Sequence, residues 1–313
     1  MPVGFTFFSV SIHYSTTIHR GGSMTSLRAD FVGRLQLKGF STRTISNYVA
    51  AVAALSAFHK RSPLALTQDD IRTFYLHEIN VKKMAARTVN LHMAALKTFY
   101  NLMAPESTVM KGITRLKCPK EIPVVLDTQE VQRLIDSIHN LKHKAAVTLL
   151  YSGGLRLNEC VNLKPHHIES GRMKIRVEQG KGNKDRYTIL SNRALSLLRE
   201  YFKAYRPKQW LFEGRNGHVH QRMLHIIIRT AARKAHINKP VSPHTLRHCF
   251  ATHLLEQGVS LQVIQQLLGH SSIKTTAIYT HVTSAMLDKV VSPFDAASSG
   301  NNGKIRKQRG RHE

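Results

Sequence analysis

Cysteine is scarce in this sequence of 313 residues, which contains only Cys118, Cys160 and Cys249 and no CxxC spacing. That scarcity argues against a disulfide framework and a cysteine zinc site, and it fits a reducing cytoplasm, where we expect the protein to work. Long apolar runs are also missing, because no stretch reaches the roughly 18 residues that a membrane-spanning helix needs. The opening MPVGFTFFSVSIHY lacks the basic start and the cleavage site of a secretory signal. We therefore expect no membrane partner.

Acidic residues are few as well. The 19 Asp plus Glu stand against 46 Lys plus Arg, which gives a formal net charge of +27. An excess of this size requires counterions or a polyanionic partner. Most basic residues are spread through amphipathic segments rather than gathered in low-complexity blocks, so the charge belongs to folded surfaces. Nucleic acid is therefore the favoured partner.

The two ends of the chain differ from its middle. Residues 1–23 show no clear period and are interpreted as an N-terminal extension, and translation beginning at Met24 is the alternative. Residues 295–313 are rich in Ser, Gly, Asn and basic side chains, which cannot bury apolar surface, so we predict a disordered basic tail.

The length between these ends favours two domains. Residues 24–107 carry apolar side chains three and four positions apart, which predicts a compact domain of four helices. Ser41 lies before the second helix, and Thr67 with Asp70 predicts a capping box for the third. Residues 108–124 lose this periodicity and place lysines and an arginine near prolines, which indicates a basic linker.

A second domain is predicted over residues 125–294, beginning with the helix cap at Asp127. Helix predominates in it, with one exception. Between Met173 and Leu190, two alternating segments flank GKGNKD, whose glycines and asparagine favour a turn between antiparallel strands. The fold class we predict is mainly α with a small β-sheet.

Several basic residues of this second domain suit the cutting of a phosphodiester. Such chemistry needs cationic donors on the non-bridging oxygens, and arginine can hold two oxygens at once. In SPHTLRHCF, His244 and Arg247 lie three positions apart on a predicted helix that begins at Pro243, so both can address one phosphate. Arg156 follows a glycine pair, where the backbone can approach a ligand closely. Three further candidates are Lys181 in the predicted turn, His270 after a helix-ending glycine, and Tyr279.

The order of these segments resembles the tyrosine recombinase family, also called the phage integrase family, and is most similar to its Xer-like branch. The segments are GLRLNE, GKGNKDR, HTLRH with FATHLLE, LLGHSSI and IYTHV. The resemblance extends from about Leu27 to Val290, and its catalytic half is highly specific. It implies a two-domain DNA clamp, with an N-terminal four-helix core-binding domain and a C-terminal mixed α+β catalytic domain.

The resemblance also implies a role for each candidate. Arg156 and Arg247 correspond to arginines that clamp the scissile phosphate, and His270 to a second phosphate-contacting histidine. Lys181 corresponds to the lysine that protonates the leaving 5′ oxygen, and Lys184 in the same turn is the alternative. The remaining assignments are His244 for general acid/base work, Tyr279 as the nucleophile, Glu159 as a supporting acidic residue, and His248 and His253 as structural or supporting groups.

The resemblance further implies the partners, which are double-stranded DNA, a homotetramer assembled on two recombination sites, and accessory proteins. Residues 283–293 would then pack on a neighbouring protomer. It implies no cofactor and no metal.

Three other functions fit parts of the sequence. A type IB topoisomerase uses a similar set of residues to relax supercoils. A metal-dependent nicking enzyme is suggested by His218 and His220, or by His244 and His248 as a zinc pair, although neither pair has an accompanying ligand set. A binding module without catalysis would lack at least one of the six catalytic residue types, and none is missing.

Overall fold

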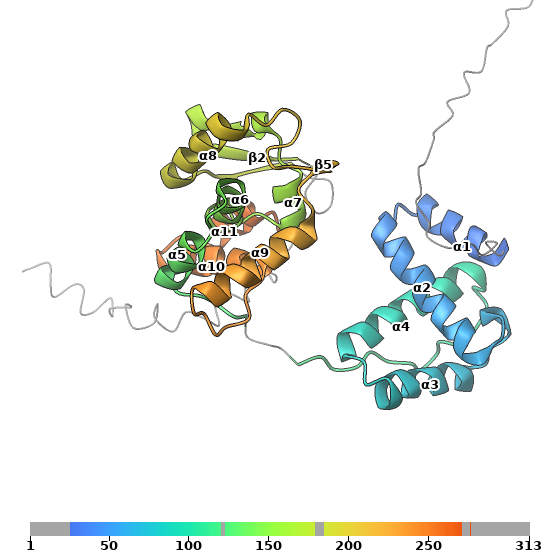
Figure 1. Cartoon of the computed structure of the whole chain (residues 1–313). Coiled ribbons are helices and arrows are strands. Elements are labelled where there is room, and N and C mark those ends of the chain that lie inside the picture. Colours follow the sequence, from blue (N-terminus) through green and yellow to red (C-terminus); the bar gives the residue numbers. More distant parts are fainter. Residues whose placement is uncertain (1–25, 120–122, 179–184, 271–275, 277–313) are drawn as a thin grey trace, which may run out of the picture. The chain divides into compact units, whose positions relative to one another are not determined.

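The computed structural model describes residues 26–119, 123–178, 185–270 and 276. The chain divides at Lys120 into two compact units, which are described separately (Figure 1). The expectations for residues 1–23 and 295–313 lie outside the described residues, as do Lys181, Lys184 and Tyr279.

The first unit contains the four α-helices predicted for it. The core lies between them and includes Phe31, Leu55 and Phe99, each 2% exposed or less. Helix α2 packs against the other three helices, and α1 also contacts α4. The helices are α1 (Ser26–Leu37), α2 (Thr42–His59), α3 (Gln68–Leu76) and α4 (Ala86–Met103), with short turns η1 (Pro63–Ala65) and η2 (His77–Val81).

The predicted helix starts in this unit are confirmed. The Ser41 side chain accepts a hydrogen bond from the Thr44 backbone N–H at 3.2 Å. Thr67 and Asp70 form the predicted capping box, with each side chain accepting from the other's backbone N–H. These caps satisfy donors that the first turn of a helix leaves unpaired.

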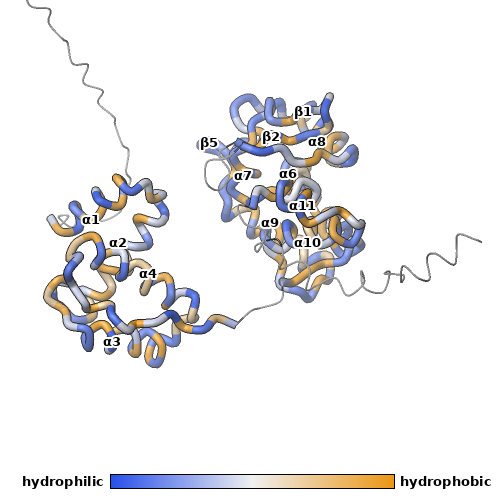
Figure 2. The backbone as a smooth tube through the Cα atoms, turned by 180° about the vertical axis from the view of Figure 1, so that it is seen from behind, coloured by the Kyte–Doolittle hydropathy of each residue, from blue (hydrophilic) through white to orange (hydrophobic). Residues whose placement is uncertain are grey.

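The second unit is built around α6, which packs against five other helices. Ten of the fourteen residues of α10 are buried, so this helix lies largely in the interior of the unit. In Figure 2, apolar and polar stretches alternate along the outer helices. The helices are α5 (Thr128–Asp136), α6 (Leu141–Ser152), α7 (Leu157–Val161), α8 (Asn192–Tyr205), α9 (Gln221–Lys234), α10 (Pro243–Glu256) and α11 (Leu261–Leu268).

The predicted hairpin is confirmed by β2 (Lys174–Val177) and β3 (Arg186–Ile189), which pair antiparallel with Val177 opposite Arg186. A third strand that we did not predict, β1 (Ile168–Glu169), pairs with β2. It lies between turns η3 (Pro165–His167) and η4 (Ser170–Arg172).

The segment around EGRNG forms a tight hairpin of β4 (Glu213–Gly214) and β5 (Gly217–His218), which the sequence did not lead us to expect. Strands of two residues are too short for their alternation to be read from sequence. Among the described helices, none is long and apolar enough to cross a membrane.

Candidate active site

Helix α10 carries two of the candidate residues. Pro243 occupies the first helical position, as the sequence predicts, and Ser242 caps the helix. His244 and Arg247 therefore lie one turn apart on the same helix. His244 is exposed, whereas Arg247 is only 4% exposed.

Arg156 caps the start of α7, two residues after Gly154. Gly154 has a φ of +58°, and a Cβ at this position would overlap the ring of Phe250. The glycine therefore lets the backbone pack closely against Phe250. The Gly154 carbonyl also accepts a hydrogen bond from Arg247 Nη1 at 2.7 Å.

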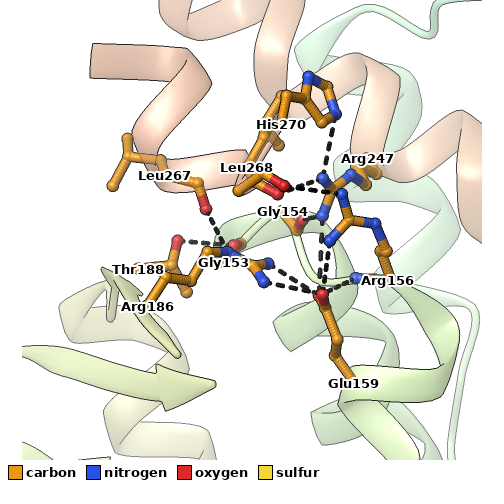
Figure 3. A network of polar contacts seen from close by, with 11 residues as sticks. Gly153, Gly154, Arg156, Glu159, Arg186, Thr188, Arg247, Leu267, Leu268 and His270 are labelled. Carbon is orange, nitrogen blue, oxygen red and sulfur yellow. Dashed lines mark hydrogen bonds and ion pairs between the residues drawn. The ribbon is translucent and has the colours of Figure 1, made fainter. Parts of the chain in front are cut away.

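Three arginines from separate elements meet at the C-terminal end of α11 (Figure 3). The last carbonyls of a helix lack intrahelical partners and carry the negative end of its dipole, so this end attracts cations. Each arginine donates to a different carbonyl in a row of three. The pairs are Arg186 Nε with Leu267 O at 2.8 Å, Arg247 Nη2 with Leu268 O at 2.5 Å, and Arg156 Nη2 with Gly269 O at 3.2 Å.

The same three arginines surround one buried carboxylate, Glu159, whose side chain is 5% exposed. Arg186 donates to both of its oxygens, at 2.7 and 2.8 Å, and Arg156 Nη1 donates to Oε1 at 2.7 Å. Arg247 Nη1 lies 3.7 Å from Oε2. Burial alone would raise the pKa of Glu159, but the hydrogen bonds and charge of Arg186, followed by those of Arg156, lower it to about 2. Glu159 is therefore ionised, and it balances one of the three cations.

His270 follows Gly269, the C-cap of α11, and contacts this cluster. Its Nε2 lies 3.2 Å from Arg247 Nη2, and its Nδ1 lies 3.0 Å from the hydroxyl of Thr276, a fully buried residue. Burial, and then the charges of Arg247, Arg156 and Arg186, lower the pKa of His270 to about 4.

The other histidines of α10 divide into two kinds. The pKa of His244 is lowered by loss of surrounding water and then by Arg247, and the pKa of His248 is lowered by burial and then by His244. Both thus favour the neutral form, which is the form that can accept a proton. His253 is buried, and its ring nitrogens contact the Tyr151 hydroxyl and the Leu126 carbonyl, both at 2.9 Å.

The structure brings together four of the six predicted catalytic residues within one unit. Arg156, Arg247 and His270 are joined by the contacts above, and His244 lies one turn before Arg247 on α10. Lys181 and Tyr279 lie outside the described residues. Arg186 was missed as a member of this cluster. Its only signal in the sequence is its place at the end of GKGNKDR, which does not show that it faces Glu159.

The histidine pairs considered as metal ligands have other contacts. His218 Nδ1 lies 2.9 Å from the Val219 carbonyl, and His220 caps α9. Among the described residues, three side chains that could hold a metal ion do gather elsewhere, namely His166, His167 and Glu178. There, His167 Nδ1 accepts the Lys164 backbone N–H at 3.1 Å, so a neutral ring carries its proton on Nε2 and directs it toward Glu178. That arrangement favours a direct contact between the His167 imidazole and the Glu178 carboxylate over binding of a metal ion by the two groups.

The arginine cluster at the end of α11, with neutral histidines beside it, is suited to bind a phosphate group. The guanidinium groups are held in place before any ligand arrives, and a phosphate diester would meet several donors at once. The fold and the site together define a mainly α-helical protein of two units, the second of which holds a preformed cluster of arginines.

The protein belongs to the phage integrase family of tyrosine recombinases, and its similarities lie with the Xer-like members. Residues 124–286 match the model of the phage integrase family, and residues 27–107 match that of the phage integrase N-terminal SAM-like domain. The putative integrase/recombinase y4qK of Sinorhizobium fredii is 40% identical over 278 residues, covering 87% of this chain and 89% of that protein. Tyrosine recombinase XerA of Pyrococcus horikoshii is 32% identical over 267 residues, covering 84% of this chain and 91% of that protein.

Solved structures agree with this assignment. The XerA recombinase structure is 31% identical, with a TM-score of 0.50, over 84% of this chain and 95% of that one. A lambda integrase dimer bound to a COC′ core site shares the fold with a TM-score of 0.68 at 19% identity, over 81% of this chain and 94% of that one.

Proposed function

We propose that this recombinase cuts and rejoins duplex DNA through a 3′-phosphotyrosyl intermediate on Tyr279, exchanging strands between two sites without metal or ATP. The observation that carries the proposal is the arginine cluster. Arg156 and Arg247 are held by Glu159 and by the end of α11, and His270 lies beside Arg247. A scissile phosphate placed against them would be held by fixed cations.

The proposed reaction is a balanced exchange at phosphorus. The Tyr279 hydroxyl oxygen forms a bond to the phosphorus and gives up its proton, for which neutral His244 is the proposed acceptor. The bond from phosphorus to the 5′ oxygen breaks, and Lys181 supplies the proton that this oxygen needs. Rejoining reverses these steps with the 5′ hydroxyl of a different strand, so the energy of the broken bond is kept.

The size of the barrier explains why several groups are needed. A tyrosine with an ordinary pKa near 10 costs roughly 4 kcal/mol to ionise at pH 7. Losing one well-placed oxyanion donor typically adds about 3 to 4 kcal/mol to a barrier. Two arginines and a histidine around one phosphate are therefore enough to account for a large part of the rate acceleration.

Double-stranded DNA is the proposed substrate. Related structures were solved with it, including XerH recombinase on its difH substrate, 20% identical with a TM-score of 0.65. The net charge of +27 supports the same substrate. We also propose a homotetramer on two recombination sites, accessory proteins that control direction, and a cytoplasmic location, which the three free cysteines suit.

We assign one role to each part of the chain. Residues 24–107 would bind DNA, residues 108–124 would link the two domains, and residues 125–294 would carry out catalysis. The two domains would together form a clamp around the duplex. The matches of the two family models over 27–107 and 124–286 support these boundaries.

The test uses a nicked suicide substrate. Cleavage releases a short fragment that carries the 5′ hydroxyl, and its loss prevents rejoining. Wild-type protein should become covalently attached to the 3′ phosphate without added metal or nucleotide, and Tyr279→Phe should bind the DNA but form no adduct. Tyr205→Phe is the matched control, because Tyr205 is 47% exposed. Adduct formation by Tyr279→Phe would contradict the assignment. Relaxation of plasmids without matched sites would favour the topoisomerase, and a need for a divalent metal would favour the nicking enzyme.

A further inference from the structure

Arg186 is held in the cluster through all three of its side-chain nitrogens. It lies at the start of β3, and its side chain is 8% exposed, against 20% for Arg156 and 5% for Arg247. Its Nη1 and Nη2 donate hydrogen bonds to the two Glu159 carboxylate oxygens, and its Nε donates to the Leu267 carbonyl. Arg186 thus connects β3, the start of α7 and the end of α11.

The charge of Arg186 matters because Glu159 is buried. A buried carboxylate draws the nearest cations toward itself unless its charge is already balanced. Glu159 Oε2 lies only 3.7 Å from Arg247 Nη1, and Oε1 already binds Arg156. With Arg186 bound to both oxygens, the carboxylate is satisfied, and the positive charge of Arg156 and Arg247 remains available to a phosphate.

Arg186 also touches the backbone that leads into His270. Gly269 ends α11 with a φ of +62°, and a Cβ there would lie 2.7 Å from Arg186 Cδ and 3.1 Å from its Nε. The side chain therefore packs directly on the turn that follows α11. Moving Arg186 would move the carbonyl of Leu267 and the start of the segment that carries His270.

We propose that Arg186 is a positioning residue for DNA cleavage, which neutralises Glu159 and holds the end of α11 so that Arg156, Arg247 and His270 are presented to the scissile phosphate. This proposal rests on the proposed function. The two can fail separately, because absence of cleavage by the wild-type protein would overturn the function, whereas the behaviour of Arg186 variants in a cleaving protein decides the role of Arg186.

The experiment measures single-turnover adduct formation and DNA affinity for Arg186→Met and Arg186→Lys. Arg172→Met is the control, because Arg172 lies in the same unit with a side chain that is 65% exposed. Arg186→Met should keep its DNA affinity within about twofold while its cleavage rate falls about 10- to 100-fold, since small displacements of reacting groups are costly. Arg186→Lys should recover only part of the rate, because a lysine lacks the planar fork that binds both carboxylate oxygens. Wild-type rates for both variants would overturn the proposal.

Two further measurements separate positioning from a general loss of structure. The first uses a substrate whose scissile phosphate has one non-bridging oxygen replaced by methyl, which removes its charge. If Arg186 keeps cations available to that charge, the rate loss of Arg186→Met should be smaller on the neutral linkage. An equal loss on both substrates would contradict the proposal.

The second measurement is a double-mutant cycle with Glu159→Gln. Removing the carboxylate charge removes the need to balance it, so the double variant should cleave faster than Arg186→Met alone. Purely additive losses would contradict the proposal. If Arg186→Met proves too unstable to purify, Arg186→Lys takes its place in both comparisons, on the neutral linkage and in the cycle with Glu159→Gln.

Discussion

Arg247 Nη2 lies 3.2 Å from His270 Nε2, and the direction of this hydrogen bond determines the state of the imidazole. A guanidinium group has donors only, so Nε2 must accept. The neutral ring therefore carries its proton on Nδ1, which donates to the Thr276 hydroxyl at 3.0 Å. Without DNA, His270 is an acceptor for Arg247. A phosphate arriving beside Arg247 would introduce a negative charge and favour the protonated ring.

The first prediction concerns the pH dependence of stability. The pKa of His270 is about 4 in the folded protein, below its ordinary value of 6.5. Between these values the unfolded chain binds a proton that the folded protein does not, so this contribution to stability is complete above about pH 6.5 and is lost as the pH falls toward 4. Denaturant unfolding across this range should show a steeper loss for wild type than for His270→Gln. Parallel curves would contradict the low pKa.

The second prediction concerns Gly269→Ala, with Gly258→Ala as its control. Both glycines have positive φ, +62° and +85°, but a Cβ at Gly258 would meet nothing within 4 Å. The control should lose about 1 to 2 kcal/mol of unfolding free energy from backbone strain alone. Gly269→Ala should lose more and should also slow DNA cleavage, because its Cβ displaces Arg186. Equal losses and unchanged cleavage would show that this contact is unimportant.

The third prediction concerns the proton for the leaving group. Lys181→Ala should slow cleavage of ordinary DNA but should spare a substrate whose bridging 5′ oxygen is replaced by sulfur, because a thiolate leaves without a proton. Cleavage of the two substrates can be compared directly on gels. Lys184→Ala is the control and should show no such rescue. If only the Lys184 variant is rescued, Lys184 is the proton donor.

The fourth prediction concerns the salt dependence of DNA binding. Each phosphate contact by Lys or Arg releases counterions, so log affinity should fall linearly with log salt, with a slope of about 0.9 per phosphate. Fluorescence anisotropy at several salt concentrations measures this slope. A flat response would remove DNA as the main partner.

The sequence predicts most local structure in this protein because local signals are strong there. The capping box at Thr67 and Asp70, the start of α10 at Pro243 and the glycine end of α11 are all confirmed. These features depend on residues within one turn of each other. The short strands β1, β4 and β5 escaped prediction because two residues show no period and pair through contacts set by the surrounding fold.

The site was predictable only in part, for a similar reason. Arg156 and Arg247 could be singled out by residue type and neighbouring motif. The role of Arg186 could not, because its partner Glu159 lies 27 positions away and Leu267 lies 81 positions away. A strand arginine has no local property that shows it turning inward to a buried carboxylate.

The row of carbonyls at the end of α11 also bears on when the site can assemble during synthesis. Its three arginines come from positions 156, 186 and 247, so the cluster cannot form until residues up to 269 have been synthesised and folded together. A chain still emerging from the ribosome, or one that has partly unfolded, lacks the assembled arginine cluster. If the cluster binds the scissile phosphate as proposed, such incomplete molecules cannot cleave DNA.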